Sequence, residues 1–325
     1  MRTARAFIVT VCLSAISLLA TAASAQAANQ IEFGTTGRTD ANMIATYIAL
    51  EKKMFEAEGL SIDWIAAGSA GRAAQQTVAG SLNISTSATD QTIRAISEGA
   101  PLKIIGGAVT IASFRTVGAK DIQNWSQLKG KTISVGGASD QTLFFFRVMA
   151  RKNNLGDHDY DLVYGGTTPA RFSQLMSGAV GAAVLIDPQD IAAINMGYTD
   201  LGFVPDYVPV WAQVSVYVNA PWAQAHHADV VAFLRALRKA TSFFYDPKNE
   251  DETLAVMMKY TGADRPTAEH LYHFYVERQV VAHGATISEK GVQAVVDSLV
   301  QMGSLSAPLP LGSLVDTSYF SEASQ

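Results

Sequence analysis

The stretch GSAGRAAQQTVAGSLNIST, residues 68–86, contains the pattern that decides the fold of this chain. A turn of small residues opens a helix that carries Arg72 near its start, a glycine ends the helix, and an apolar strand follows. Residues 165–185, GGTTPARFSQLMSGAVGAAVL, show the same order about 99 residues later, with Arg171 in the matching place. The repeat predicts two lobes built on one plan.

Strands alternate with helices on both sides of this repeat, which indicates an α/β fold with mainly parallel sheets. Strands are predicted at residues 31–34, 61–66, 82–87, 102–105, 132–135, 161–164, 182–186 and 214–218. Helices are predicted at residues 41–58, 70–80, 90–98, 140–154, 169–177, 228–245, 252–260, 267–279 and 288–302. The last helices are expected to fold back onto the first lobe.

The order of these elements predicts a hinge with two crossings, near Ile111–Arg115 and near Tyr207–Gln213. The expected domains are a signal peptide at 1–27, a first lobe from 28–112 plus 219–325, and a second lobe at 113–218.

The composition excludes several classes of protein. Of 325 residues, 48% are hydrophobic and 16% are charged, which is typical of a globular chain rather than a disordered one. The net charge is −5 and no basic run occurs, so nucleic acid is not expected as a partner. The one cysteine, Cys12, excludes disulfides within the chain and cysteine-rich metal sites.

The first 25 residues have the pattern of a secretory signal peptide. Arg2 and Arg5 precede an apolar stretch at residues 6–19, and small residues around Ala25 provide cleavage sites. The apolar stretch is shorter than the roughly 20 residues that a membrane span needs. We expect an exported protein without cysteine and with 22 basic and 29 acidic residues, a net charge of −7.

Five polar turns follow predicted strands, and in such sheets ligands bind beyond the carboxyl ends of the strands. Small residues let a ligand approach the backbone, hydroxyls supply hydrogen bonds, and helix N-termini attract anions. The turns are residues 35–39, 69–71, 85–89, 136–139 and 165–168. Capping of helices explains each turn equally well when it is taken singly.

Four arginines near these turns could hold an anionic group through paired hydrogen bonds: Arg38, Arg72, Arg115 and Arg171. Pairing with a nearby acid is the alternative for each of them. Arg115 lies beside the first predicted crossing, where it could face the cleft or form a hinge salt bridge.

Known catalytic motifs are absent from the sequence: G-x-S-x-G, H-E-x-x-H, the Walker A loop and G-x-G-x-x-G do not occur. His270 and His273 share a helix face, but they lack the full spacing of a zinc motif. We therefore expect no metal, no cofactor and no catalytic residue. An enzyme would need an acid or base in the cleft, for which Asp90, Asp140 and Asp187 are the candidates.

The order of several segments resembles the periplasmic substrate-binding proteins of ABC importers in the nitrate/sulfonate/taurine (SsuA/NMT1-like) family. The segments are ALEKKMFEAEGLSIDW (49–64), residues 68–86, APLKII (100–105), LKGKTISVGG (128–137), residues 165–185 and DPQD (187–190). The resemblance covers residues 31–302. It implies a periplasmic binding protein of type II, in which two α/β lobes close on a ligand and deliver it to a membrane permease.

The resemblance also implies a set of cleft positions from both lobes. With Arg115 added from the residues themselves, the candidate ligand-binding residues are Thr36, Gly37, Arg38, Ser69, Ser87, Ala88, Thr89, Arg115, Gly137, Ala138, Ser139 and Asp187. The chain lacks the cysteine-rich segment of the hydroxymethylpyrimidine-binding branch, which disfavours binding of a thiamine precursor.

These observations predict a monomeric periplasmic solute-binding protein that captures a small organic anion, a sulfonate or a carboxylate, and serves an ABC permease at the inner membrane. Two alternatives stay open. One is a periplasmic, dehydratase-like enzyme on the same two-lobed fold, and the other is a binding protein that serves a TRAP-type importer or a sensor.

Overall fold

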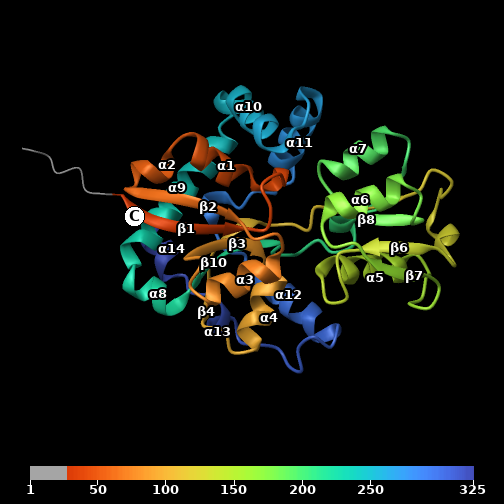
Figure 1. Cartoon of the computed structure of the whole chain (residues 1–325), viewed down its shortest axis with the longest axis horizontal. Helices are drawn as coiled ribbons and strands as arrows, with labels where there is room; N and C mark the ends of the chain where they lie inside the picture. Colours follow the sequence, from red (N-terminus) through yellow and green to blue (C-terminus); the bar gives the residue numbers. More distant parts are fainter. Residues whose placement is uncertain (1–27) are drawn as a thin grey trace, which may run out of the picture.

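A computed structural model describes residues 28–325 of the chain. The predicted signal peptide, with Cys12, lies outside the described residues. The chain forms two lobes, each built around a five-stranded sheet (Figure 1). The first sheet has the order β2 (Leu60–Ala66), β1 (Asn29–Thr35), β3 (Ile84–Ala88), β10 (Val214–Asn219), β4 (Leu102–Val109). The second has the order β7 (Asp161–Tyr164), β6 (Thr132–Val135), β8 (Ala182–Ile186), β5 (Phe114–Gly118), β9 (Thr199–Phe203).

The two sheets share one topology, which confirms the predicted repeat. In the first, β1 pairs in parallel with β2 and β3, and β10 runs antiparallel to β3 and β4. In the second, β6 pairs in parallel with β7 and β8, and β5 runs antiparallel to β8 and β9. Strand β1 in one lobe therefore corresponds to β6 in the other.

The two crossings lie where the sequence predicts them. The chain leaves the first sheet after Val109 and enters the second at Phe114, then returns through residues 207–213. The predicted boundary at residue 218 is wrong, because the backbone of β10 forms hydrogen bonds with β3 and β4 of the first sheet. The second lobe thus ends before Val214. Strand β10 is the first lobe's counterpart of β5, the strand that follows the other crossing.

Helices cover both faces of each sheet (Figure 1). They are α1 (Ile44–Glu51), α2 (Met54–Ala57), α3 (Ala70–Val78), α4 (Thr89–Ser97), α5 (Gln141–Lys152), α6 (Thr168–Met176), α7 (Gln189–Asn195), α8 (Ala220–Ala225), α9 (His227–Tyr245), α10 (Glu250–Thr261), α11 (Arg265–Glu277), α12 (Glu289–Gln301), α13 (Leu311–Leu314) and α14 (Ser318–Ala323). None of the helices in residues 28–325 is long and apolar enough to cross a membrane.

The helix predicted at residues 41–58 is wrong in one respect, because it is divided. A 3₁₀ turn, η1 (Ala41–Met43), precedes α1, and Lys53 has a left-handed backbone (φ 53°) that separates α1 from α2. The C-terminal helices return to the first lobe as predicted, since α9 packs on α1, α2 and α14. Its buried face, which includes Phe233 and Leu237, joins the same core as Ile31 and Phe33 of β1.

Candidate functional site

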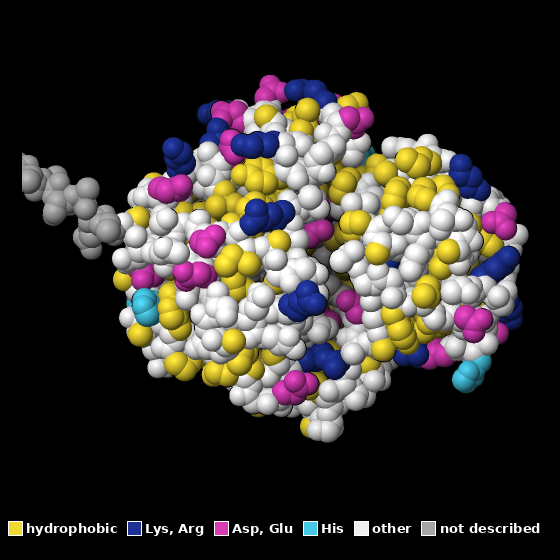
Figure 2. Space-filling model, viewed as in Figure 1, with side chains coloured by type: hydrophobic (Ala, Val, Ile, Leu, Met, Phe, Trp, Pro, Cys, Tyr) yellow, Lys and Arg dark blue, Asp and Glu magenta, His cyan; other side chains and the backbone are white. Residues whose placement is uncertain are grey.

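A cavity of about 570 Å³ lies between the lobes, at the groove that separates them in the space-filling view (Figure 2). All five predicted polar turns contribute to its wall. From the first lobe come Thr35, Thr36, Gly37, Thr39, Asp40, Gly68, Ser69, Ala70, Thr86, Ser87 and Ala88, and from the second Gly136, Asp140, Gln141, Thr142, Gly166, Thr167, Thr168, Pro169 and Arg171. The parallel strands β1 and β6 point their carboxyl ends at this cavity, as expected for such sheets.

The charged side chains of the wall are Asp40, Asp140 and Arg171. Arg171 is 3% exposed and belongs to α6 in the second lobe. Its Nε donates to the carbonyl of Val184 at 2.6 Å, one terminal nitrogen donates to the carbonyl of Gly166, and the other donates to Thr168 Oγ1 at 2.9 Å. A guanidinium has five N–H donors, so each terminal nitrogen keeps one N–H for a ligand.

The electrostatic setting keeps Arg171 positively charged. Burial lowers the pKa of Arg171 to about 10, although the carboxylates of Asp140 and Asp40 act in the opposite direction. None of the acids in residues 28–325 lies within ion-pair distance of this guanidinium. The N-terminus of α6 also faces the cavity, and its N-cap Thr167 makes no capping hydrogen bond with its side chain. The second-lobe wall can therefore hold an anionic group.

Five of the predicted binding residues line the cavity: Thr36, Gly37, Ser69, Ser87 and Ala88. The Ser69 hydroxyl accepts from the backbone N–H of Arg72 at 3.2 Å and so caps α3. The Ser87 hydroxyl is 3.0 Å from that of Tyr217 in β10. Two of these hydroxyls therefore also stabilise the first lobe.

The other seven predicted residues lie outside the wall. Thr89 is buried, with its hydroxyl 2.6 Å from Ser215 Oγ. Gly137, Ala138 and Ser139 lie in the turn between β6 and α5, of which only the flanking Gly136 and Asp140 reach the cavity.

Arg38 and Arg72, which the sequence offered as possible anion ligands, are exposed and do not line the cavity. The guanidinium of Arg38 lies over the ring of Trp64, 4.6 Å from its centroid, and donates to the Trp64 carbonyl. The imidazole of His273 lies 3.5 Å from a carboxylate oxygen of Glu250, and neither residue belongs to the cavity wall.

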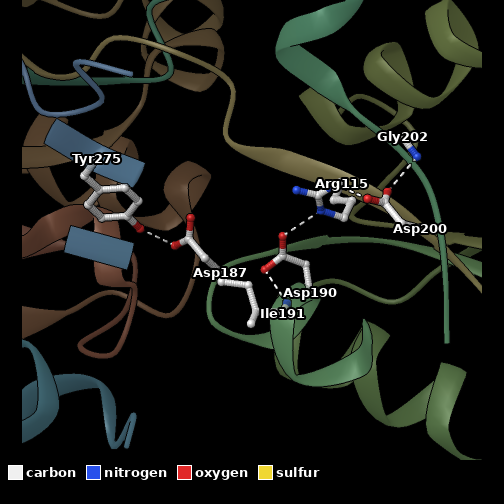
Figure 3. A network of polar contacts seen from close by, with 7 residues as sticks. All are labelled: Arg115, Asp187, Asp190, Ile191, Asp200, Gly202 and Tyr275. Atoms are coloured by element: carbon white, nitrogen blue, oxygen red, sulfur yellow. Dashed lines mark hydrogen bonds and ion pairs between the residues drawn. The ribbon is translucent and has the colours of Figure 1, made fainter. Parts of the chain in front are cut away.

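Arg115 and Asp187 belong to a network of polar contacts outside the cavity wall (Figure 3). Arg115 in β5 pairs with Asp190 of α7, with 3.2 Å between Nε and Oδ2, and with Asp200 of β9. It also lies over the ring of Phe203, 4.9 Å from the centroid. Arg115 therefore joins three elements within the second lobe and is the hinge-side salt bridge that the sequence offered as the alternative.

Asp187 connects the two lobes. Its carboxylate follows β8 in the second lobe and accepts a hydrogen bond from the hydroxyl of Tyr275, which belongs to α11 in the first lobe (Figure 3). Both side chains are buried. Burial raises the pKa of Asp187 well above its usual range, and the neighbouring Asp190 raises it further.

Two further contacts join the lobes near this bond and at the opposite rim. The rings of Phe203 in β9 and Phe274 in α11 meet edge to face, with centroids 5.4 Å apart. The side-chain amide of Gln91 in α4 donates to the carbonyl of Ser139 at 3.3 Å. The described conformation therefore has the lobes in contact around the cavity.

The two crossing segments are themselves joined. The backbone N–H of Ser113 donates to the side chain of Gln213 at 2.9 Å, and the N–H of Gln213 donates to Val109 at 3.0 Å. Trp211 in the second crossing donates to Gln141 at 3.1 Å and stacks on Phe144. This geometry suits a hinge made of two hydrogen-bonded crossing segments.

The candidate ligand-binding residues did not include the three charged residues of the wall, Asp40, Asp140 and Arg171, although Arg171 was considered as an anion ligand and Asp140 as a cleft carboxylate of an enzyme. Arg171 was weighed equally with Arg72, because both follow a polar turn at matching positions. The available signal for the two aspartates was their shared position, since each follows the strand that pairs in parallel on both sides, β1 or β6, by five residues, from Thr35 to Asp40 and from Val135 to Asp140.

Comparison with known proteins places the chain among two-lobed folds. The alkanesulfonate-binding protein SsuA of Xanthomonas axonopodis pv. citri, solved with MOPS, is similar with a TM-score of 0.74 and 16% identity over 89% of this chain and 98% of that one. The ligand-binding component of an ABC-type import system from Staphylococcus aureus, solved with zinc, has a TM-score of 0.75 and 11% identity over 91% and 99%. The desulfurization enzyme DSZB has a TM-score of 0.66 and 13% identity over 91% and 98%.

At these identities the solved structures establish the fold and not the ligand. No curated protein matches the chain. Residues 40–250, well over half of the chain, match the model of a family described as NMT1/THI5 like.

Proposed function

Because the chain belongs to the NMT1/THI5-like family, we propose that it is a periplasmic solute-binding protein of an ABC importer and that its solute carries an anionic group. The fold is that of binding components of such importers, among them the sulfonate-binding protein SsuA. The predicted signal peptide supports export. An inner-membrane permease would be the partner.

The observation that carries the anionic group is the buried Arg171. It lies on the cavity wall with one N–H free on each terminal nitrogen, beside the N-terminus of α6. A planar guanidinium presents paired donors that match a carboxylate or a sulfonate. Closure of the lobes around the solute replaces its water with these donors, and no bond is made or broken.

The ligand test uses the purified protein. Mass spectrometry of small molecules released on denaturation identifies a retained solute, and a thermal-shift screen of sulfonates and carboxylates finds others. A solute at 100 times its Kd adds about 2.7 kcal/mol to the free energy of unfolding. A folded protein that no member stabilises would contradict the proposal.

A matched pair of variants tests the role of Arg171. Arg171→Lys keeps the charge but loses the planar fork, and we expect it to weaken binding of the solutes found by the screen by about 10-fold or more. Arg72→Lys changes the corresponding, exposed residue of the first lobe and is expected to leave affinity unchanged. Equal affinities in both variants, with Arg171→Lys folded, would exclude Arg171 as the anion ligand.

The second candidate function is an enzyme, because the desulfurization enzyme DSZB has a similar fold. The three candidate carboxylates do not favour it. Asp90 is outside the cavity wall, Asp187 accepts a hydrogen bond from Tyr275, and the side chain of Asp140 caps α5. NMR of a solute incubated with the protein distinguishes the two, since an enzyme would convert it and a binding protein would not.

A further inference from the structure

Asp40 and Asp140 occupy equivalent places in the two lobes. Each is the N-cap residue of the first helical segment after the central parallel strand, β1 in one lobe and β6 in the other. Both line the cavity. If the two residues had the same structural role, their side chains would make the same capping bonds.

Their hydrogen bonds differ. The carboxylate of Asp140 accepts from the backbone N–H of Thr142 at 2.8 Å and from the Thr142 hydroxyl at 2.5 Å, which caps α5. The matching residue in the first lobe is Asn42, and the Asp40 side chain makes no capping hydrogen bond. Across residues 28–325 the Asp40 carboxylate accepts no hydrogen bond and pairs with no cation within 4 Å.

The loop around Asp40 is nevertheless held in place. The backbone carbonyl of Asp40 accepts from the Tyr47 hydroxyl at 3.0 Å and from the N–H of Met43 at 3.1 Å. At the end of β1, where the loop begins, Thr35 Oγ1 donates to the Gly37 carbonyl at 2.7 Å and accepts from the Trp64 indole at 2.8 Å. A carboxylate on a fixed loop at a cavity wall is pre-organised for a ligand.

A second polar group of the same wall has no partner. The hydroxyl of Thr86, in the middle of β3, is buried and finds no hydrogen-bond partner in the described chain. Buried polar groups are normally paired, because an unpaired one loses its hydration without compensation. The first-lobe wall therefore has two unpaired polar groups, which a bound solute can satisfy.

Charge balance indicates the chemistry of that solute. The wall carries two carboxylates and one guanidinium, so a purely anionic solute at Arg171 would also meet Asp40. Burial raises the pKa of Asp40, and the charge of Arg171 only partly offsets this effect. A positively charged N–H group placed at Asp40 would compensate this partly buried carboxylate.

We propose that the solute carries a protonated amine as well as an anionic group, and that Asp40 in the first lobe binds the amine while Arg171 in the second binds the anion. This inference rests on the proposed binding function and specifies its ligand class. One charged residue from each lobe would hold one end of the solute, so only a solute with both groups would engage both lobes fully.

The test uses matched pairs of solutes that differ only in the amine: 3-aminopropane-1-sulfonate against propane-1-sulfonate, and the same comparison for sulfonates and carboxylates of two to eight carbons. Affinities are measured by calorimetry for the unaltered protein, for Asp40→Asn and for Asp63→Asn. Asp63 is exposed on β2 of the same lobe, so its substitution controls for the loss of one negative charge.

We expect the amine-bearing member to bind about 10- to 100-fold more tightly than its partner in the unaltered protein. Asp40→Asn should remove most of that preference by weakening the amine-bearing member, and it should leave the amine-free member unchanged or bound more tightly. Asp63→Asn should keep the preference. A purely structural role of Asp40 would instead weaken both members alike.

Two results would overturn the inference in distinguishable ways. If amine-free solutes bind as tightly as their amine-bearing partners, and Asp40→Asn changes neither affinity, the amine site is refuted. The proposed binding function would still stand. Failure of the folded protein to bind any member or to retain any solute would refute the binding function and this inference together.

Discussion

The hydrogen bond between Tyr275 and Asp187 provides the sharpest test of how the lobes are held together. It joins α11 of the first lobe to the end of β8 in the second, and neither residue lines the cavity (Figure 3). Tyr275→Phe removes only the hydroxyl. The change therefore acts on the contact between lobes without touching the solute.

The size of the effect follows from the burial of both groups. A hydrogen bond contributes about 1 kcal/mol when its partners are neutral and up to about 3 kcal/mol when one is charged. The loss should shift the equilibrium between closed and open lobes by about 5- to 150-fold toward the open form. Solute affinity should fall by a similar factor if closure is required for tight binding.

The assay uses single-molecule fluorescence energy transfer between dyes on the two lobes. Residues 28–325 contain no cysteine, so Asp63→Cys and Lys129→Cys place one label on an exposed position of each lobe. Tyr272→Phe is the matched control, because Tyr272 is buried on the same helix and donates no hydrogen bond to a described residue. If Tyr275→Phe and Tyr272→Phe give the same population of open molecules, the bond does not hold the lobes together.

Three further outcomes are expected. Burial, and secondly the charge of Asp140, raises the pKa of Asp90 from 3.8 to about 7. The folded protein therefore binds this proton more tightly than the unfolded chain, and the protein should lose stability as the pH rises from about 4 to 7. Asp90→Asn should remove about 3 kcal/mol of this dependence between pH 5 and pH 8 in denaturant unfolding, since each pH unit below the folded pKa corresponds to about 1.4 kcal/mol. An unchanged pH slope would contradict the assignment. Arg38→Ala should leave solute affinity unchanged in calorimetry, because Arg38 lies over Trp64 outside the cavity, whereas a marked loss would return Arg38 to the site. Gly107→Ala should cost about 1–3 kcal/mol in thermal unfolding, because its methyl group would collide with the Thr286 carbonyl, while Gly312→Ala meets no atom within 4 Å and should be neutral.

The fold could be predicted from the sequence because its signals are local. The turns before α3 and α6, their arginines and the glycines that end both helices repeat in the same order, and each lobe follows that plan. The strands that escaped prediction are β5 and β9, which are antiparallel partners in the second sheet. Their charged members, Arg115 and Asp200, pair with one another, so the hydrophobic pattern of both strands is interrupted.

The site could be predicted only in part, because its wall depends on contacts between distant elements. Each of the five turns brings at least one small or hydroxyl residue to the cavity, since strand ends of a parallel sheet converge there, but Thr89 and residues 137–139 lie outside the wall. Arg38, Arg115 and Asp187 lie outside the cavity wall and contact Trp64, Asp190 and Tyr275 instead. These partners are remote in sequence or lie on elements that the pattern does not reveal. Local sequence indicates where such a residue lies in its element, but not which side chain from another element contacts it.

The two repeated lobes explain why the first lobe contributes an unpaired carboxylate to the cavity and the second a guanidinium. Each lobe has an aspartate before its first helix and an arginine at the start of a later one: Asp40 and Arg72 in the first, Asp140 and Arg171 in the second. In the second lobe, Thr142 donates a hydrogen bond to the carboxylate of Asp140. The guanidinium of Arg171 is held at the wall by hydrogen bonds to the carbonyls of Val184 and Gly166. In the first lobe the arginine is exposed and the aspartate is left without a partner. Equivalent positions therefore differ in opposite ways. The cavity between the lobes has an unpaired carboxylate from the first lobe and a guanidinium with unused N–H groups from the second, which is the arrangement that a solute with both charges would need.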